Sequence, residues 1–129
     1  MPEVGNMGLP KKILAKGIKD MVRISDGRMS GTGFGTVVLH VSPEAAMGGN
    51  FNVIRDGDLI TLDVEARSLH LHVSDEELNK RKKTQKITPF ATERGYVSLY
   101  VKHVEQSHQG ADFDFLKGSS GSDVSRDSH

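Results

Sequence analysis

Residues 26–35 concentrate the side chains of this sequence that could perform chemistry. They bring an acid, a base, the hydroxyls of Ser30 and Thr32 and four glycines together between two apolar runs. Glycines let a backbone approach a ligand closely and adopt positive φ angles. A serine hydroxyl acts as a base or nucleophile only when a histidine or a bound cation lowers its pKa. Ser30 is therefore a candidate catalytic residue, and the alternative is a serine that caps a turn.

The histidines and the basic run offer weaker candidates. His40 follows the glycine loop and could serve Ser30, but no Ser-His-Asp order is recognisable. His70 and His72 are two apart on one expected strand face, a spacing that can bind a metal. The more common interpretation is the solvated face of a half-buried strand. Residues 80–83 are all basic and could bind phosphate, although such a run usually ends a solvated helix.

The glycines at 31, 33 and 35 do not form a dinucleotide-binding fingerprint. That fingerprint requires a strand, a glycine turn and then a helix, whose N-terminus holds the phosphate. Here residues 36–41 are rich in β-branched side chains and predict a strand instead. With the strand expected at 21–25, they indicate a hairpin that presents the glycine loop. A purely structural turn remains the alternative.

The elements around this loop predict an α+β fold, a small mixed sheet or barrel flanked by helices. Apolar spacing predicts a helix over 9–20, and the segment 43–47 looks like one helical turn ended by two glycines. The remaining expected elements are strands at 51–55, 59–65 and 68–73 with an Asp-Gly hairpin turn at 56–58, a helix capped at Ser74, and a helix over 96–109. From Gly118 onward the composition predicts a disordered tail.

Composition bounds the possible functions. The chain has 129 residues, enough for one domain, and its 17 basic residues balance its 17 acidic ones. That balance gives no electrostatic reason to expect nucleic acid or a membrane surface as a partner. No apolar run approaches the roughly 20 residues of a membrane span, and no export signal is recognisable, so a cytoplasmic location is expected. The absence of cysteine excludes an iron–sulfur cluster ligated by thiolates of this chain.

Read together, these segments resemble the C-terminal domain of the dihydroxy-acid dehydratase / phosphogluconate dehydratase family. The resemblance covers nearly the whole chain in the right order. The matching pieces are 1–3 (Met-Pro-Glu), 26–31 (Asp-Gly-Arg-Met-Ser-Gly), 40–45 (His-Val-Ser-Pro-Glu-Ala), 57–60 (Gly-Asp-Leu-Ile) and 73–78 (Val-Ser-Asp-Glu-Glu-Leu). Residues 2–7, 30–32 and 110–116 look most like the sugar-acid branch, and the branched-chain amino-acid branch is the alternative.

The resemblance implies a swivelling β/β/α-type barrel domain at 1–117 and an enzyme that removes water from a 2,3-dihydroxy acid to give a 2-keto acid. It implies that Ser30 is the base that takes the C2 proton and that Thr32 is its companion hydroxyl. Glu3 matches a magnesium ligand. In the family, an iron–sulfur cluster acts as a Lewis acid on the departing 3-hydroxyl, and a magnesium ion holds the carboxylate and the 2-hydroxyl.

One departure from the family limits what this chain can do alone. The cluster cysteines and the other magnesium ligands of the family lie in a large N-terminal domain. The chain is therefore expected to bind neither group by itself and to be inactive without a cluster-bearing domain or subunit. A non-catalytic interaction module is the competing interpretation. In either case we expect apolar surface and a homo-oligomer.

Overall fold

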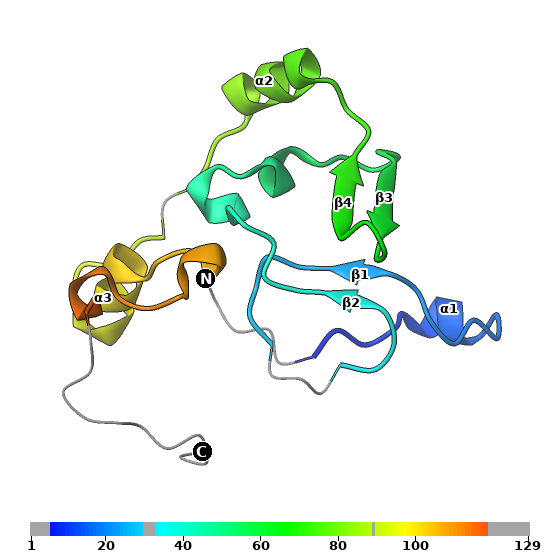
Figure 1. The fold of residues 1–129 in the computed structure, drawn as a ribbon, viewed down its shortest axis with the longest axis horizontal. Helices are drawn as coiled ribbons and strands as arrows, with labels where there is room; N and C mark the ends of the chain where they lie inside the picture. The colour runs from blue at the N-terminus through cyan, green and yellow to red at the C-terminus, as the bar shows by residue number, and fades with distance from the viewer. Residues whose placement is uncertain (1–5, 30–32, 89, 119–129) are drawn as a thin grey trace.

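The structure, a computed structural model, describes residues 6–29, 33–88 and 90–118. Two small sheets lie among short helices, and α1 and α3 lie at opposite ends of the molecule (Figure 1). The elements are α1 (Lys11–Leu14), β1 (Arg23–Ile24), β2 (Val37–Val38), η1 (Ala45–Met47), η2 (Asn50–Val53), β3 (Ile60–Asp63), β4 (Ser68–Leu71), α2 (Asp75–Thr84), α3 (Gly95–His103), η3 (Ser107–Gln109) and η4 (Asp114–Leu116). The α+β class is confirmed, in its mixed-sheet form.

The strands on either side of the glycine loop pair in parallel. Arg23 lies opposite Val37 and Ile24 lies opposite Val38. The hairpin expected at this point is therefore wrong. Antiparallel neighbours can be joined by a two-residue turn, whereas parallel neighbours need a connection of about a dozen residues. Residues 25–36, between the end of β1 and the start of β2, have the length that such a connection needs.

The second sheet is an antiparallel hairpin. Ile60 pairs with Leu71 and Asp63 pairs with Ser68, so residues 64–67 close the turn. The expected Asp-Gly turn forms, with Gly57 at φ 91°, but it precedes β3 instead of joining two strands. The strand expected at 51–55 is wrong, because η2 occupies most of that segment.

Local signals account for the ends of the three α-helices. The Ser74 hydroxyl accepts a hydrogen bond from the Glu77 amide at 3.3 Å and begins α2 as predicted. The helix expected over 9–20 is shorter in the structure: α1 ends at Leu14, and a turn that closes at Gly17, with φ 74°, follows it. The helix expected over 96–109 ends at His103, since Val104 forms a β-bridge with Phe113.

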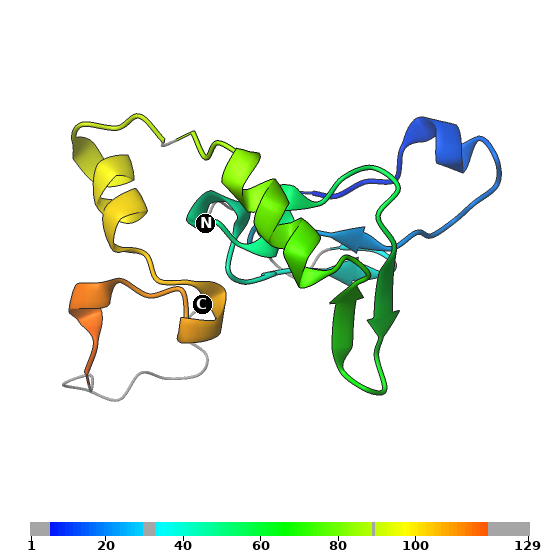
Figure 2. The same cartoon turned by 90° about the horizontal axis from the view of Figure 1, so that it is seen from above.

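Few apolar side chains are buried within the described ranges. Met29, Val53 and Leu78 are the buried hydrophobic residues there, contributed by the glycine loop, η2 and α2. Helix α2 crosses beside η2 (Figure 2), and Arg81 joins them through hydrogen bonds to the Val53 carbonyl and the Asp58 carboxylate. Large apolar side chains such as Phe34 (78% exposed) lie on the surface. The domain therefore presents more apolar surface than its own core covers.

Candidate functional site

The three site residues expected from the sequence, Glu3, Ser30 and Thr32, lie outside the described residues. Their assignments stay predictions. The structure describes the chain on both sides of Ser30 and Thr32, and the chain from Asn6 onward after Glu3. The geometry of the site is therefore built from the contacts that hold these flanking segments.

The first half of the glycine loop is held by the segment that follows β2. The amide of Ser25 donates to the Val38 carbonyl at 2.9 Å, and the amide of Val41 donates back to the Ser25 carbonyl at 3.2 Å. The Ser25 hydroxyl accepts a hydrogen bond from the Gly27 amide at 3.0 Å. These bonds extend the pairing of β1 and β2 and fix the chain as it enters the loop.

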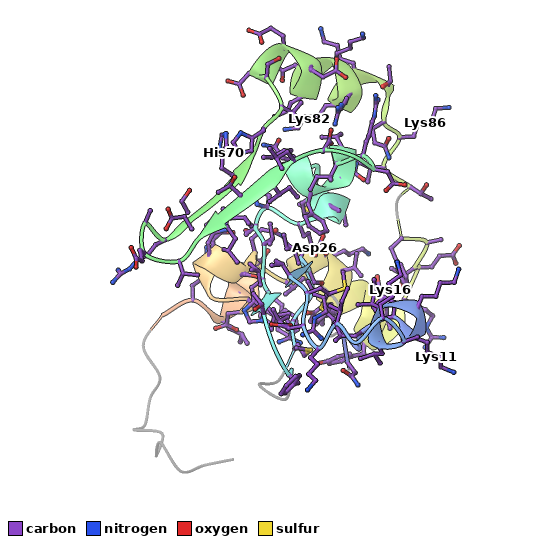
Figure 3. All side chains as sticks on the ribbon, turned by 90° about the vertical axis from the view of Figure 1, so that its right-hand side faces the viewer. Lys11, Lys16, Asp26, His70, Lys82 and Lys86 are labelled. Atoms are coloured by element: carbon purple, nitrogen blue, oxygen red, sulfur yellow. The ribbon has the colours of Figure 1, made fainter. Side chains whose placement is uncertain are left out.

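Asp26 connects this entrance to the turn at 43–45. Its carboxylate accepts a hydrogen bond from the Ala45 amide at 2.7 Å, at the beginning of η1. Figure 3 shows Asp26 within the body of the domain, and Lys11 and Lys16 on side chains that extend outward. The bond satisfies one of the amides that a helix start leaves without an intrahelical partner. Asp26 thus acts in this structure as an anchor of the loop.

Glu44 gives the Pro-Glu-Ala signature a structural role that the sequence did not reveal. Glu44 is buried, with 5% of its surface exposed. The Glu44 amide donates to Gln106 Oε1 at 2.8 Å, and Gln106 Nε2 donates to Glu44 Oε1 at 3.1 Å. The reciprocal pair ties the signature turn to the segment after α3. Through Ala45 and Asp26, the same turn is tied to the glycine loop.

The far end of the glycine loop is held by Asp20. Its carboxylate accepts hydrogen bonds from the Thr36 amide at 3.0 Å and the Thr36 hydroxyl at 2.8 Å. The bond from the Thr36 amide is the main reason why the pKa of Asp20 lies below its usual value. A Cβ on Gly35 would lie 2.2 Å from the Asp20 carboxylate, and Gly35 has φ 82°. Only glycine therefore fits where the loop rejoins β2.

Arg23 contacts both segments that flank the expected site residues. Its guanidinium donates hydrogen bonds to the carbonyl oxygens of Met7 and Phe34. The side chain is 10% exposed, and its Nη2 lies 3.6 Å from an Asp20 carboxylate oxygen. Sequence reasoning missed this residue, because an arginine in a short strand normally indicates a solvated face.

Arg28, inside the loop, carries a buried donor. Its Nε is buried and has no hydrogen-bond partner within the described part of the chain. Buried polar groups are paired in nearly all native structures.

The structure shows the surroundings of the candidate histidines His40, His70 and His72. His70 and His72 are both exposed, their rings meet edge to face with centroids 4.7 Å apart, and His72 Nε2 lies 2.8 Å from the Thr61 hydroxyl. Among residues 6–29, 33–88 and 90–118, no three potential metal ligands gather. His40 is exposed with φ 59°.

The basic run at 80–83 is divided between two roles. Arg81 is 10% exposed on its side chain and pairs with Asp58 (2.6 Å) and Glu77 (3.0 Å), so it is a structural residue. Lys82 and Lys83 are exposed. Figure 3 shows Lys82 on α2 with His70 on the neighbouring strand.

Within the described ranges, no helix has the length and apolar character that crossing a membrane would require.

Comparisons with known proteins give one consistent result. The family model for the C-terminal domain of dihydroxy-acid/6-phosphogluconate dehydratases matches residues 1–111. An L-arabinonate dehydratase of Rhizobium leguminosarum bv. trifolii is 58% identical over 129 residues, which is all of this chain and 22% of that protein. A 6-deoxy-6-sulfo-D-gluconate dehydratase of Pseudomonas putida is 49% identical over 91% of the chain and 20% of its own length. A dihydroxy-acid dehydratase of Streptococcus suis is 41% identical over the same shares. The chain thus spans about a fifth of the length of these curated relatives.

Proposed function

This chain belongs to the dihydroxy-acid/6-phosphogluconate dehydratase family as its C-terminal domain, and from that premise we propose that it serves a dehydratase of aldonic acids. The observation that carries the choice of substrate class is the order of identities. Relatives named for sugar acids are 58% and 49% identical, and relatives named for dihydroxy acids are 41% to 46% identical. Dehydration of a branched-chain dihydroxy acid is the second candidate, supported by those weaker matches.

In the proposed reaction, Ser30 accepts the proton from C2 of the sugar acid. The electrons of the C2–H bond form the C2–C3 double bond as the 3-hydroxyl leaves as hydroxide. The proton that Ser30 takes from C2 balances the one that converts this hydroxide to water, so no net proton is gained or lost. The enol that results becomes the 2-keto-3-deoxy acid. Thr32 is the hydroxyl that accompanies Ser30. The chain supports this proposal by holding both ends of the glycine loop, through Asp26 at the entrance and Asp20 at the exit.

The residues of this chain do not fit the family's cofactors by themselves. The sequence contains no cysteine for an iron–sulfur cluster. Glu3 is a single carboxylate, and no cluster of further ligands occurs among the described residues. An oxygen-rich magnesium site needs more ligands than one. The cluster and most magnesium ligands would come from the N-terminal part of the dehydratase, and the chemistry that they supply is polarisation of the leaving hydroxyl and of the substrate carboxylate.

We propose that the contact with that N-terminal part lies on the apolar face around Leu14 and Phe34, which are 51% and 78% exposed and line the same surface hollow. Phe34 belongs to the glycine loop, so this face adjoins the segment that carries Ser30 and Thr32. Burial of such side chains is the main favourable contribution to association. The occupant is the remaining four-fifths of the relatives' length, which this chain does not match.

The experiment replaces the matching segment of the Rhizobium enzyme with this chain and measures formation of 2-keto acid. We expect activity with L-arabinonate above that with a branched-chain dihydroxy acid, and loss of activity in Ser30→Ala. The matched control is Ser68→Ala, which removes an exposed hydroxyl on β4 and is expected to leave activity unchanged. An active Ser30→Ala enzyme would refute the role of the base. An inactive hybrid that still assembles would favour the non-catalytic interaction module.

The docking face is tested separately by Phe34→Asp. We expect this charge to weaken association of the separately expressed N-terminal part with this chain, measured by calorimetry. Phe90→Asp, at a residue that is 67% exposed and precedes α3, is the matched control and is expected to bind normally. Equal binding by both variants would exclude this face.

A further inference from the structure

We propose that Arg23 is a positioning residue that joins the two chain segments on which the expected site residues lie. One of its hydrogen bonds reaches the carbonyl of Met7, four residues after Glu3, and another reaches the carbonyl of Phe34, four residues after Ser30. A single side chain thus connects the magnesium-ligand segment to the base-bearing loop. This inference rests on the proposed function, in which both segments act on one substrate.

Arginine suits this role for a geometric reason. A guanidinium carries five N–H donors in a planar fork, so it can bond two acceptors that lie in different directions. The carbonyls of Met7 and Phe34 lie outside helices and strands and need donors from elsewhere. A lysine ammonium has rotatable donors on a flexible stem and does not reproduce this fork. The contact therefore depends on the shape of the side chain as well as on its charge.

The surroundings of Arg23 leave its donors directed at these carbonyls. Its Nε also donates to the Met21 carbonyl at 3.4 Å. Among the described residues, the carboxylate that pairs with Arg23 is that of Asp20, whose Oδ1 lies 3.6 Å from Nη2, longer than a hydrogen bond. The Asp20 oxygens are already engaged by Thr36. The side chain is 10% exposed, so water competes little for its donors. Arg81 is equally shielded but bonds Asp58 and Glu77 with its donors.

The backbone of Arg23 is itself fixed. Its amide donates to the Thr36 carbonyl at 3.0 Å, and the residue pairs with Val37 across the parallel sheet. A rigid strand therefore carries the side chain that holds the two segments. Because a displacement of about 1 Å in a reacting group can cost 100-fold in rate, the distance between these segments bears directly on catalysis.

The activity test uses the hybrid enzyme with Arg23→Gln and Arg23→Lys. We expect Arg23→Gln to lower kcat by about 100-fold, with KM within threefold of the parent, because Arg23 positions groups and does not hold the substrate. Arg23→Lys is expected to recover part of kcat. Arg55→Gln, at an arginine whose side chain is 59% exposed, is the matched control and is expected to retain full kcat. A change confined to KM would overturn the positioning role.

A second measurement is independent of activity and follows amide hydrogen exchange in this chain. We expect Arg23→Lys and Arg23→Gln to accelerate exchange in residues 6–8 and 33–36 together, with α2 unchanged. Faster exchange in only one segment, or equally in α2, would overturn the proposal. An inactive parent hybrid with exchange changed in both segments would instead refute the proposed function and leave the connection intact.

Discussion

Replacing Gln106 with alanine is expected to release the turn at 43–45 from the segment after α3. The side chain makes two hydrogen bonds with Glu44, one to its amide and one to its carboxyl group. Gln106→Ala removes both bonds, and it also removes the hydrogen bond that the Gln106 side chain accepts from the Gln109 amide at the start of η3. Because the Ala45 amide bonds Asp26, the release is expected to reach the entrance of the glycine loop.

The expected loss of local stability follows from the types of the two hydrogen bonds. A neutral hydrogen bond such as that from the Glu44 amide contributes about 1 kcal/mol, and a bond to a charged group contributes about 1.5 to 3 kcal/mol. Glu44 is 5% exposed, so water replaces neither bond without local opening. Together the bonds amount to about 2.5 to 4 kcal/mol of local stability. At about 1.4 kcal/mol per factor of ten, that is roughly a 60- to 700-fold rise in the opening equilibrium.

Hydrogen exchange of the Glu44 and Ala45 amides measures this opening directly. We expect both amides to exchange about 100-fold faster in Gln106→Ala. Gln85→Ala, at an exposed glutamine that follows α2, is the control and is expected to leave both rates unchanged. A double-mutant cycle with Glu44→Ala then isolates the coupling between the two side chains. Acceleration below about fivefold would refute the assignment of Glu44 and Gln106 as a stabilising pair.

Three further outcomes are expected. Asp58→Asn is expected to weaken the ion pair between Asp58 and Arg81. Because the hydrogen bond from Arg81 lowers the pKa of Asp58, the stability that this pair contributes is fully present above pH about 4 and is lost as the pH falls through the lowered pKa. Acid titration of unfolding measures this loss. Gly49→Ala places a Cβ 1.9 Å from a carbonyl oxygen and is expected to cost about 1 to 3 kcal/mol in urea unfolding, whereas Gly8→Ala, with nothing within 4 Å, is expected to be neutral. Ser74→Ala is expected to cost about 1 kcal/mol by removing the N-cap of α2, measured in the same titration.

The sequence predicted those parts of the fold that are determined by neighbouring residues. Helix α2 begins after Ser74 because the Ser74 hydroxyl caps it. The turn η1 ends at Gly48, which adopts φ 79°. The error at β1 and β2 had another origin, because two β-branched runs flanking a glycine loop have the same appearance in a hairpin and in a parallel pair. Their relative direction depends on how the intervening loop travels, which alternation of apolar residues does not encode.

The sequence offers site residues where a family resemblance supplies them, and it misses the residues whose role depends on packing. Ser30, Thr32 and Glu3 follow from motifs and stay predictions, since they lie outside the described residues. Arg23, Glu44 and the residues that they contact have no motif that announces them. They join segments far apart in the chain, as the 62 positions between Glu44 and Gln106 illustrate. Only the folded structure brings such partners together.

Parallel pairing of β1 and β2 makes the length of the intervening loop a structural constraint. A hairpin tip can lose residues while its strands keep their register, whereas this segment must reach back from the end of one strand to the start of the other. Deleting a glycine from it would therefore pull the strands out of alignment before it altered any side chain. The sheet therefore limits the number of residues in the loop, in addition to the residue types that the positions of Asp26 and Gly35 require.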